Sequence, residues 1–188
     1  MRILGIHDGH NASACLLEDG VVRAAVQEER LSRLKNHNGF PERAIRWVLA
    51  TTGTAPASLD RVAFHSLHMP YPKTTEELLE EYHRSQSLGT SLKRIIKRTP
   101  VRAWHRSRRR NSRIEAARQA GLPVDRIVFV DHHTCHAAAA YHGSPWKEDK
   151  VLVLTADGMG DDLCATVWLG ERGHLGSPIA SVDDSHSL

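Results

Sequence analysis

The stretch ILGIHDGHNASACL, residues 3–16, decides the expected fold, because a similar stretch, VLTADGMGDDLCAT, returns at residues 153–166. Each reads as an apolar strand, an Asp-Gly pair, a tight polar turn and a second strand of small and apolar residues. Two similar hairpins roughly 150 residues apart indicate a duplicated unit. The alternative is that two β-hairpins with Asp-Gly turns resemble each other by chance.

The polar turns of the two stretches are candidate anion-binding elements. Glycine lets backbone N–H groups approach an anion closely, and a neighbouring aspartate can hold a metal or orient water. The residues of these turns expected to bind an anionic cofactor are Gly9, Asn11, Gly158, Gly160 and Asp161.

The elements along the chain alternate in a way that favours an α/β layer protein. The Asp19-Gly20 pair between two apolar runs predicts a tight hairpin turn. The expected strands are 2–6, 12–17, 21–27, 61–65, 126–130, 150–155 and 164–169, and the expected helices are 42–51, 132–141 and a polar helical region, 74–120, broken at Pro100. The apolar face of helix 42–51 consists of Ala44, Ile45, Trp47, Val48 and Leu49.

The composition is that of a globular protein, with 40% hydrophobic and 25% charged residues among 188. Three cysteines, Cys15, Cys135 and Cys164, are odd in number and far apart, which argues against a disulfide framework and favours a reducing cytoplasm. No window approaches the roughly 20 apolar residues that span a bilayer, and the first apolar run is too short for a signal peptide. We therefore expect a cytoplasmic protein with no membrane partner.

A histidine pair is the first candidate metal site. Asp131 is placed to cap a helix that continues into an alanine run, so His132 and His136 stand at i and i+4 on one face. Such a pair can share a cation, and imidazole nitrogen suits Zn, Fe, Mn or a similar divalent ion. The alternative is two ordinary histidines at a helix start. His133 points about 100° away and is a weaker candidate.

Asp157, near the end of the next strand, is the expected third ligand. Strand ends in α/β sheets open into the same crevice, and a carboxylate beside two imidazoles favours an iron- or manganese-like mixed site.

Two residues of the first Asp-Gly turn are candidate catalytic groups. His10 can act as a general base or as a donor that polarises a carbonyl, and Asp8 can orient an incoming group or a metal-bound water. The alternatives are a turn histidine bonded to the backbone and an Asx-turn residue.

Several separated motifs occur together in one order: IHDGHNASA (6–14), QEERLSRLK (27–35), GFP (39–41), DHHxxHAA (131–138) and TADGxGD (155–161). This set resembles the carbamoyltransferases that modify nodulation factors and antibiotics. The resemblance covers nearly the whole chain except roughly residues 67–121.

The resemblance implies a ribonuclease H-like, actin-like α/β domain, shared with tRNA threonylcarbamoyl-transfer proteins. In the family, a C-terminal domain makes carbamoyl-adenylate from ATP and carbamoyl phosphate, and the actin-like domain transfers the carbamoyl group to a hydroxyl of a small-molecule acceptor. By similarity, His10 assists the transfer, and His132, His136 and Asp157 hold a divalent metal near the nucleotide phosphates.

The resemblance also implies a domain organisation. Residues 1–145 would form a complete first actin-like subdomain, with a helical, basic insertion at about 67–121, and residues 146–188 would begin a truncated second one. The rest of the second half, with a further metal-binding aspartate, and the adenylate-forming domain are missing from this sequence. We therefore expect catalysis to need parts that lie outside it.

Basic residues crowd the segment 93–118, with Trp104 and His105 among them. Phosphate contacts with aromatic stacking would make the chain an RNA-binding relative of the tRNA-modifying proteins. The acidic residues at 76–81 favour a simpler interpretation, in which two helices of opposite charge face each other or solvent, so nucleic acid is not the expected partner. A further alternative is an inactive, truncated binding module.

The run Glu28-Glu29-Arg30 has two interpretations. It can line the site, with Arg30, Arg33 or Lys35 binding an anion through charge-assisted bonds. It can equally be a solvated strand end.

Overall fold

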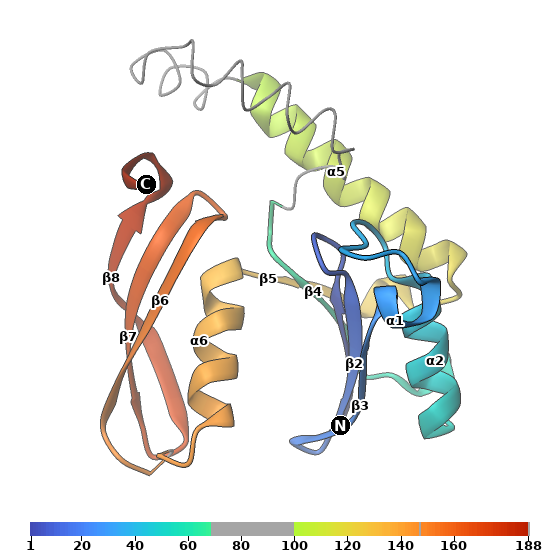
Figure 1. Cartoon of the computed structure of the whole chain (residues 1–188), viewed down its shortest axis with the longest axis horizontal. Coiled ribbons are helices and arrows are strands. Elements are labelled where there is room, and N and C mark those ends of the chain that lie inside the picture. The colour runs from blue at the N-terminus through green and yellow to red at the C-terminus, as the bar shows by residue number, and fades with distance from the viewer. Residues whose placement is uncertain (69–99, 147, 188) are drawn as a thin grey trace. The chain divides into compact units, whose positions relative to one another are not determined.

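The computed structural model describes residues 1–68, 100–146 and 148–187, which form two compact units (Figure 1). Unit 1 holds residues 1–64 and 100–128, and unit 2 holds residues 65–68 and the described residues from 129 onward. The boundary expected at residues 145–146 separates the two copies of the duplicated unit rather than these two compact units, and it stays a prediction. The expected helical region before Pro100, with its acidic residues, lies outside the described residues.

The first sheet has five strands in the order β3-β2-β1-β4-β5. They are β1 (Arg2–His7), β2 (Ser13–Glu18), β3 (Val21–Gln27), β4 (Arg61–His65) and β5 (Ile127–Val130). β2 runs antiparallel to β1 and to β3, whereas β4 runs parallel to β1. The α/β class is therefore confirmed, and this order fits the expected ribonuclease H-like, actin-like fold.

Helix α2 (Glu42–Thr52) packs against β2 and β3 and forms the core of unit 1 with them. Ala44, Ile45 and Val48 are almost completely buried, and the helix ends at Gly53, whose φ of 62° a side chain would disfavour. Trp47 was expected on this apolar face, but it is 40% exposed. Its position, one residue before Val48, turns it about 100° away from the buried face.

A short helix, α1 (Glu28–Ser32), replaces the strand end expected at Glu28. The Glu28 side chain is buried, and its carboxylate accepts hydrogen bonds from the backbone N–H groups of Ala44 (2.7 Å) and Arg43 (3.3 Å). These are donors in the first turn of α2, which has no intrahelical partners for them. Glu28 therefore caps α2, and interpreting it as a solvated residue was wrong.

The remaining elements of unit 1 are helix α5 (Pro100–Gln119) and two 3₁₀ turns, η1 (Pro56–Ser58) and η2 (Val124–Arg126). Among the described residues, no helix is both long enough and apolar enough to cross a membrane.

Unit 2 contains α6 (His132–Gly143) and a second sheet in the order β6-β7-β8, followed by η3 (Asp184–His186). The strands are β6 (Val151–Gly160), β7 (Leu163–Glu171) and β8 (His174–Asp183), and neighbours run antiparallel. β6 extends beyond the expected strand 150–155, and β8 was not expected.

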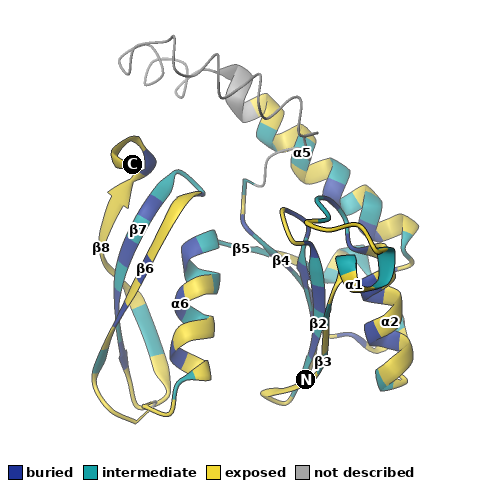
Figure 2. Ribbon diagram, in the orientation of Figure 1, coloured by how far each residue is buried: buried dark blue, intermediate teal, exposed yellow. Residues whose placement is uncertain are grey.

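Helix α6 covers one face of the second sheet. Ala137 and Tyr141 of the helix pack against Val153 and Trp168, and all four side chains are buried. The alternate side chains of β6 are exposed, Leu154 by 73%, so the sheet has one buried and one exposed face (Figure 2).

The two similar sequence stretches form similar structures. Residues 3–16 become the hairpin β1–β2, and residues 153–166 become the hairpin β6–β7. Each hairpin is followed by a third antiparallel strand through a two-residue turn with positive φ, Asp19-Gly20 in one and Arg172-Gly173 in the other. Two positive φ angles are typical of the type I′ turn, as expected for Asp19-Gly20.

Candidate metal centre

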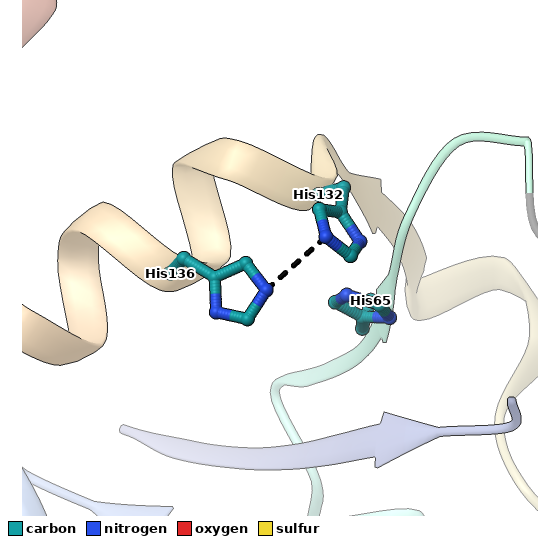
Figure 3. A group of neighbouring side chains, drawn as sticks. All are labelled: His65, His132 and His136. Atoms are coloured by element: carbon teal, nitrogen blue, oxygen red, sulfur yellow. Dashed lines mark hydrogen bonds between the residues drawn. The ribbon is translucent and has the colours of Figure 1, made fainter. Parts of the chain in front are cut away.

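The first turn of α6 presents the expected histidine pair. Asp131 caps the helix, because its Oδ1 accepts a hydrogen bond from the Thr134 N–H at 2.8 Å, which confirms the expected cap. One helical turn separates His132 from His136, and their Nε2 atoms lie 3.1 Å apart (Figure 3). Both imidazoles therefore present a nitrogen to the same small space.

Asp157 of β6 completes the expected set. Its Oδ2 lies 2.7 Å from Nε2 of His132 and 3.4 Å from Nε2 of His136. Zinc ligands at 2.0–2.1 Å from a tetrahedral ion are roughly 3.3 Å from each other. The three predicted ligand atoms are thus spaced about as the ligands of one ion are, while metal binding itself stays a prediction.

The local form of β6 accommodates this cluster. The register between β6 and β7 shifts between Ala156 and Gly160, and Asp157 lies in this irregular part. Such bulges commonly re-aim a side chain next to a functional site. Gly160 is buried against the His132 ring, where a Cβ atom would overlap the imidazole.

The protonation states of two of these groups suit ligation. Burial lowers the pKa of the His136 imidazole, the His132 ring lowers it further, and Asp157 only partly offsets this. Burial raises the pKa of Asp157, but hydrogen bonds from His132 and from the Gly158 N–H outweigh burial and hold it below its usual value. At neutral pH His136 is neutral and Asp157 is ionised, the forms in which both can bind a metal.

A third histidine, His65 at the end of β4, lies in the same cluster. Ligand nitrogens of His65, His132 and His136 all lie within 4.8 Å of one another (Figure 3). The sequence-based site did not include His65. The available signal was a histidine at the last position of a predicted strand, since strand ends often line α/β sites.

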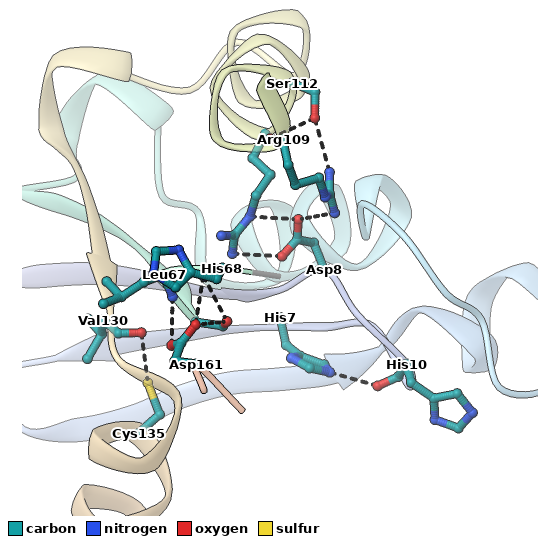
Figure 4. Close-up of polar contacts among 12 residues, drawn as sticks. His7, Asp8, His10, Leu67, His68, Arg109, Ser112, Val130, Cys135 and Asp161 are labelled. Atoms are coloured by element: carbon teal, nitrogen blue, oxygen red, sulfur yellow. Dashed lines mark hydrogen bonds and ion pairs between the residues drawn. The ribbon is translucent and has the colours of Figure 1, made fainter. Parts of the chain in front are cut away.

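Asp161, a residue expected to bind a cofactor, has its carboxylate surrounded by protein donors, and cofactor binding there stays a prediction. Its Oδ2 accepts from the backbone N–H groups of Leu67 and His132, both at 2.8 Å. Its Oδ1 accepts from the hydroxyl of Ser66 and the N–H of His68, and Figure 4 shows Leu67 and His68 beside this carboxylate. Burial raises the pKa of Asp161, but these hydrogen bonds hold it below its usual value. One carboxylate thus joins the residues after His65 to the first residue of α6.

His133 faces the core rather than the cluster. Its Nδ1 lies 2.7 Å from the Thr155 hydroxyl, which lies 2.5 Å from the Thr166 hydroxyl, and Trp168 Nε1 donates to Thr166 at 2.6 Å. All four side chains are buried. Within the described parts of the chain, Nε2 of His133 has no hydrogen-bond partner.

Asp8 forms a buried ion cluster in unit 1. Arg113 donates to both of its oxygens at 2.9 Å. Arg109 donates to Oδ2 at 3.0 Å, as Figure 4 shows. Asp8 and Arg113 are each 1% exposed, and the guanidinium of Arg113 also lies over the Phe64 ring at 4.8 Å. The expectation that these arginines face acidic helices or solvent was wrong, because a buried carboxylate holds them in the core.

The other expected residues of the first turn differ in exposure. Gly9 is buried, Asn11 is exposed with a φ of 61°, and the His10 imidazole is exposed. The carbonyl oxygen of His10 lies 2.7 Å from Nε2 of His7. In unit 2, Gly158 is exposed, and a Cβ there would meet nothing within 4 Å.

All three cysteines are free, as expected. Burial raises the pKa of the Cys135 thiol to about 11, so it is protonated and poorly reactive at neutral pH.

Fold and site together define an α/β protein with a histidine–carboxylate cluster at a helix start. The carbamoyltransferase N-terminus family model matches residues 2–184, so the chain belongs to this family. One similar protein is the nodulation protein NolNO of Sinorhizobium fredii, 32% identical over 182 residues, which cover 95% of this chain and 24% of NolNO. An uncharacterised protein of Synechocystis sp. is 31% identical over 196 residues, which cover all of this chain and 30% of that protein.

The chain therefore spans less than a third of the length of these relatives. Among solved structures, YeaZ from Pseudomonas aeruginosa matches with a TM-score of 0.43 and 14% identity, over 97% of this chain and 67% of YeaZ.

Proposed function

We propose that this chain forms the metal- and nucleotide-binding part of an enzyme that transfers a carbamoyl group from carbamoyl-adenylate to a hydroxyl of a small-molecule acceptor. The carbamoyl-adenylate would be made from carbamoyl phosphate and ATP by an adenylate-forming domain that lies outside these residues. The observation that carries the proposal is the convergence of His132, His136 and Asp157 in a chain of the carbamoyltransferase family.

Those three side chains would hold a divalent ion. When bound, the ion supplies positive charge that polarises phosphoryl or carbonyl oxygens. The protein's own contribution is positional: Gly160 leaves room for the His132 ring, and Asp161 anchors the backbone of His132. Gly158, next to Asp157, leaves the backbone open to an anionic group such as a nucleotide phosphate.

His10 is the proposed base for the acceptor hydroxyl. Its imidazole is exposed, which supports a role that requires access to an incoming substrate. Asp8 is proposed to act through position, because its two arginine partners fix the turn that carries Gly9 and His10. The free cysteines support our proposal of a reducing, cytoplasmic setting.

The test follows radiolabel from carbamoyl phosphate to hydroxyl compounds in the protein that carries this chain, with ATP and divalent metal present. We expect transfer to require metal and to fall at least roughly a hundredfold in His132→Ala and Asp157→Asn, as expected when a catalytic group is lost. The matched control is His142→Ala, an exposed histidine on the same helix. Full transfer by both site variants would overturn the proposal.

The RNA-binding alternative is weaker. Arg109 and Arg113 bind Asp8 and are not available to phosphates, although Trp104 is 55% exposed with Arg108 beside its ring. RNA binding with a steep salt dependence, lost when the exposed arginines become glutamine, would favour it. Binding of neither metal nor ATP would point to an inactive module.

A further inference from the structure

We propose that His65 is a third imidazole ligand of the metal centre, so that this chain supplies His65, His132, His136 and Asp157 to one ion. This inference rests on the proposed function and names a residue of the same site. It also narrows the range of metal ions expected at the site, because a third nitrogen ligand changes which ions bind most tightly.

The rings of the three histidines gather on one side of the α6 start. The ring centroid of His65 lies 4.7 Å from that of His132 and 6.3 Å from that of His136 (Figure 3). The rings are tilted by 57° and 77°, so they do not stack face to face. A ligand nitrogen of each ring lies within 4.8 Å of the others. Small rotations of exposed or half-buried imidazoles would bring all three onto one ion.

The chain around His65 is held in place for this role. Ser66, the next residue, is buried and has a φ of 69°, a left-handed conformation that non-glycine residues rarely adopt. Its hydroxyl and the next two N–H groups bind Asp161, whose Oδ2 also accepts from the His132 N–H. Backbone strain of this kind persists where surrounding contacts impose it, often at functional sites. The same carboxylate therefore fixes the backbone on both sides of the cluster.

Ligand chemistry gives the proposal a consequence. Imidazole suits zinc and iron, whereas magnesium and calcium prefer oxygen ligands. Three imidazoles and one carboxylate therefore favour a transition metal such as Zn²⁺ or Fe²⁺ over Mg²⁺ and Ca²⁺. A set of two imidazoles and one carboxylate would discriminate less between these metal ions.

The experiment is X-ray absorption at the zinc edge on the full chain, stripped with chelator and reloaded with one equivalent of Zn²⁺. We expect a wild-type spectrum with three imidazoles, and two in His65→Ala. Competition with a chelator should show at least a roughly tenfold loss of zinc affinity in His65→Ala. His142→Ala on the same helix should keep three imidazoles and an affinity within about twofold of the wild type.

The outcomes separate this inference from the proposed function. Two imidazoles in the wild type, with an unchanged affinity in His65→Ala, would overturn the role of His65 and leave the His132–His136–Asp157 centre standing. No stoichiometric zinc in the wild type would overturn the centre itself. If His65→Ala does not fold, the number of imidazoles in the wild-type spectrum still decides whether His65 is a ligand.

Discussion

Gly160 packs directly against the imidazole of His132, and a Cβ atom at position 160 would lie 2.5 Å from its Nε2. Gly160 has no positive φ, so the backbone accepts alanine there and only the clash matters. We expect Gly160→Ala to push the His132 ring aside and to lower zinc affinity by roughly ten- to a hundredfold. Chelator competition measures this loss.

The control for that variant is Gly143→Ala, at the end of α6, where a Cβ would meet nothing within 4 Å. It should leave zinc affinity unchanged. Equal affinities of the wild type and Gly160→Ala would mean that the ring position at 132 does not matter for binding.

Removal of the Asp8 carboxylate should destabilise the fold. In Asp8→Ala, Arg113 would remain 1% exposed without its counter-charge, and loss of one partner of a buried pair costs about 3–5 kcal/mol. Urea unfolding measures the change. Glu115→Ala, which removes the exposed partner of Arg118 on the same helix, should cost under about 1 kcal/mol. Similar small losses in both variants would contradict a structural role for Asp8.

The cap on α2 gives a second stability prediction. Glu28→Ala removes the acceptor for the N–H groups of Ala44 and Arg43, and loss of a helix cap costs about 0.5–2 kcal/mol. Glu28→Gln keeps one acceptor oxygen and should lose less. Thermal unfolding of the two variants should show this order, and the reverse order would contradict capping.

The buried hydroxyl of Thr155 gives a third stability prediction. Thr155→Val keeps the side-chain shape but leaves Nδ1 of His133 and the Thr166 hydroxyl short of a partner, which should cost about 1–3 kcal/mol. The same replacement at Thr51, exposed on α2, should be nearly neutral because valine and threonine have similar helix propensities. A neutral Thr155→Val in urea unfolding would argue against the hydrogen-bonded chain.

Local patterns in the sequence predicted much of the fold. The strand 61–65 was predicted with its observed ends, and the helix expected at 42–51 ends one residue later. These elements have strong local signals: alternating or helical apolar periods, a proline before the helix and a glycine after it. Helix α1 was not predicted, because it is short and is stabilised by its contact with α2. No local sequence pattern reveals that contact.

The candidate site was predicted in part for the same reason. His132 and His136 are one helical turn apart, a spacing visible in the sequence, and Asp157 follows on the next strand. His65 belongs to an earlier strand, and only the folded chain brings it to α6. The burial of Arg113 was also missed, because charge runs are usually solvated and Asp8 carries no local sign that it is their partner.

The four hydrogen bonds on the Asp161 carboxylate have a consequence for local motion. Three of their donors are backbone amides, those of Leu67, His68 and His132, and they share a single acceptor group. A local opening motion that displaces the Asp161 carboxylate therefore breaks the hydrogen bonds of all three amides at once. In native-state hydrogen–deuterium exchange, these amides should therefore exchange together as one cooperative unit.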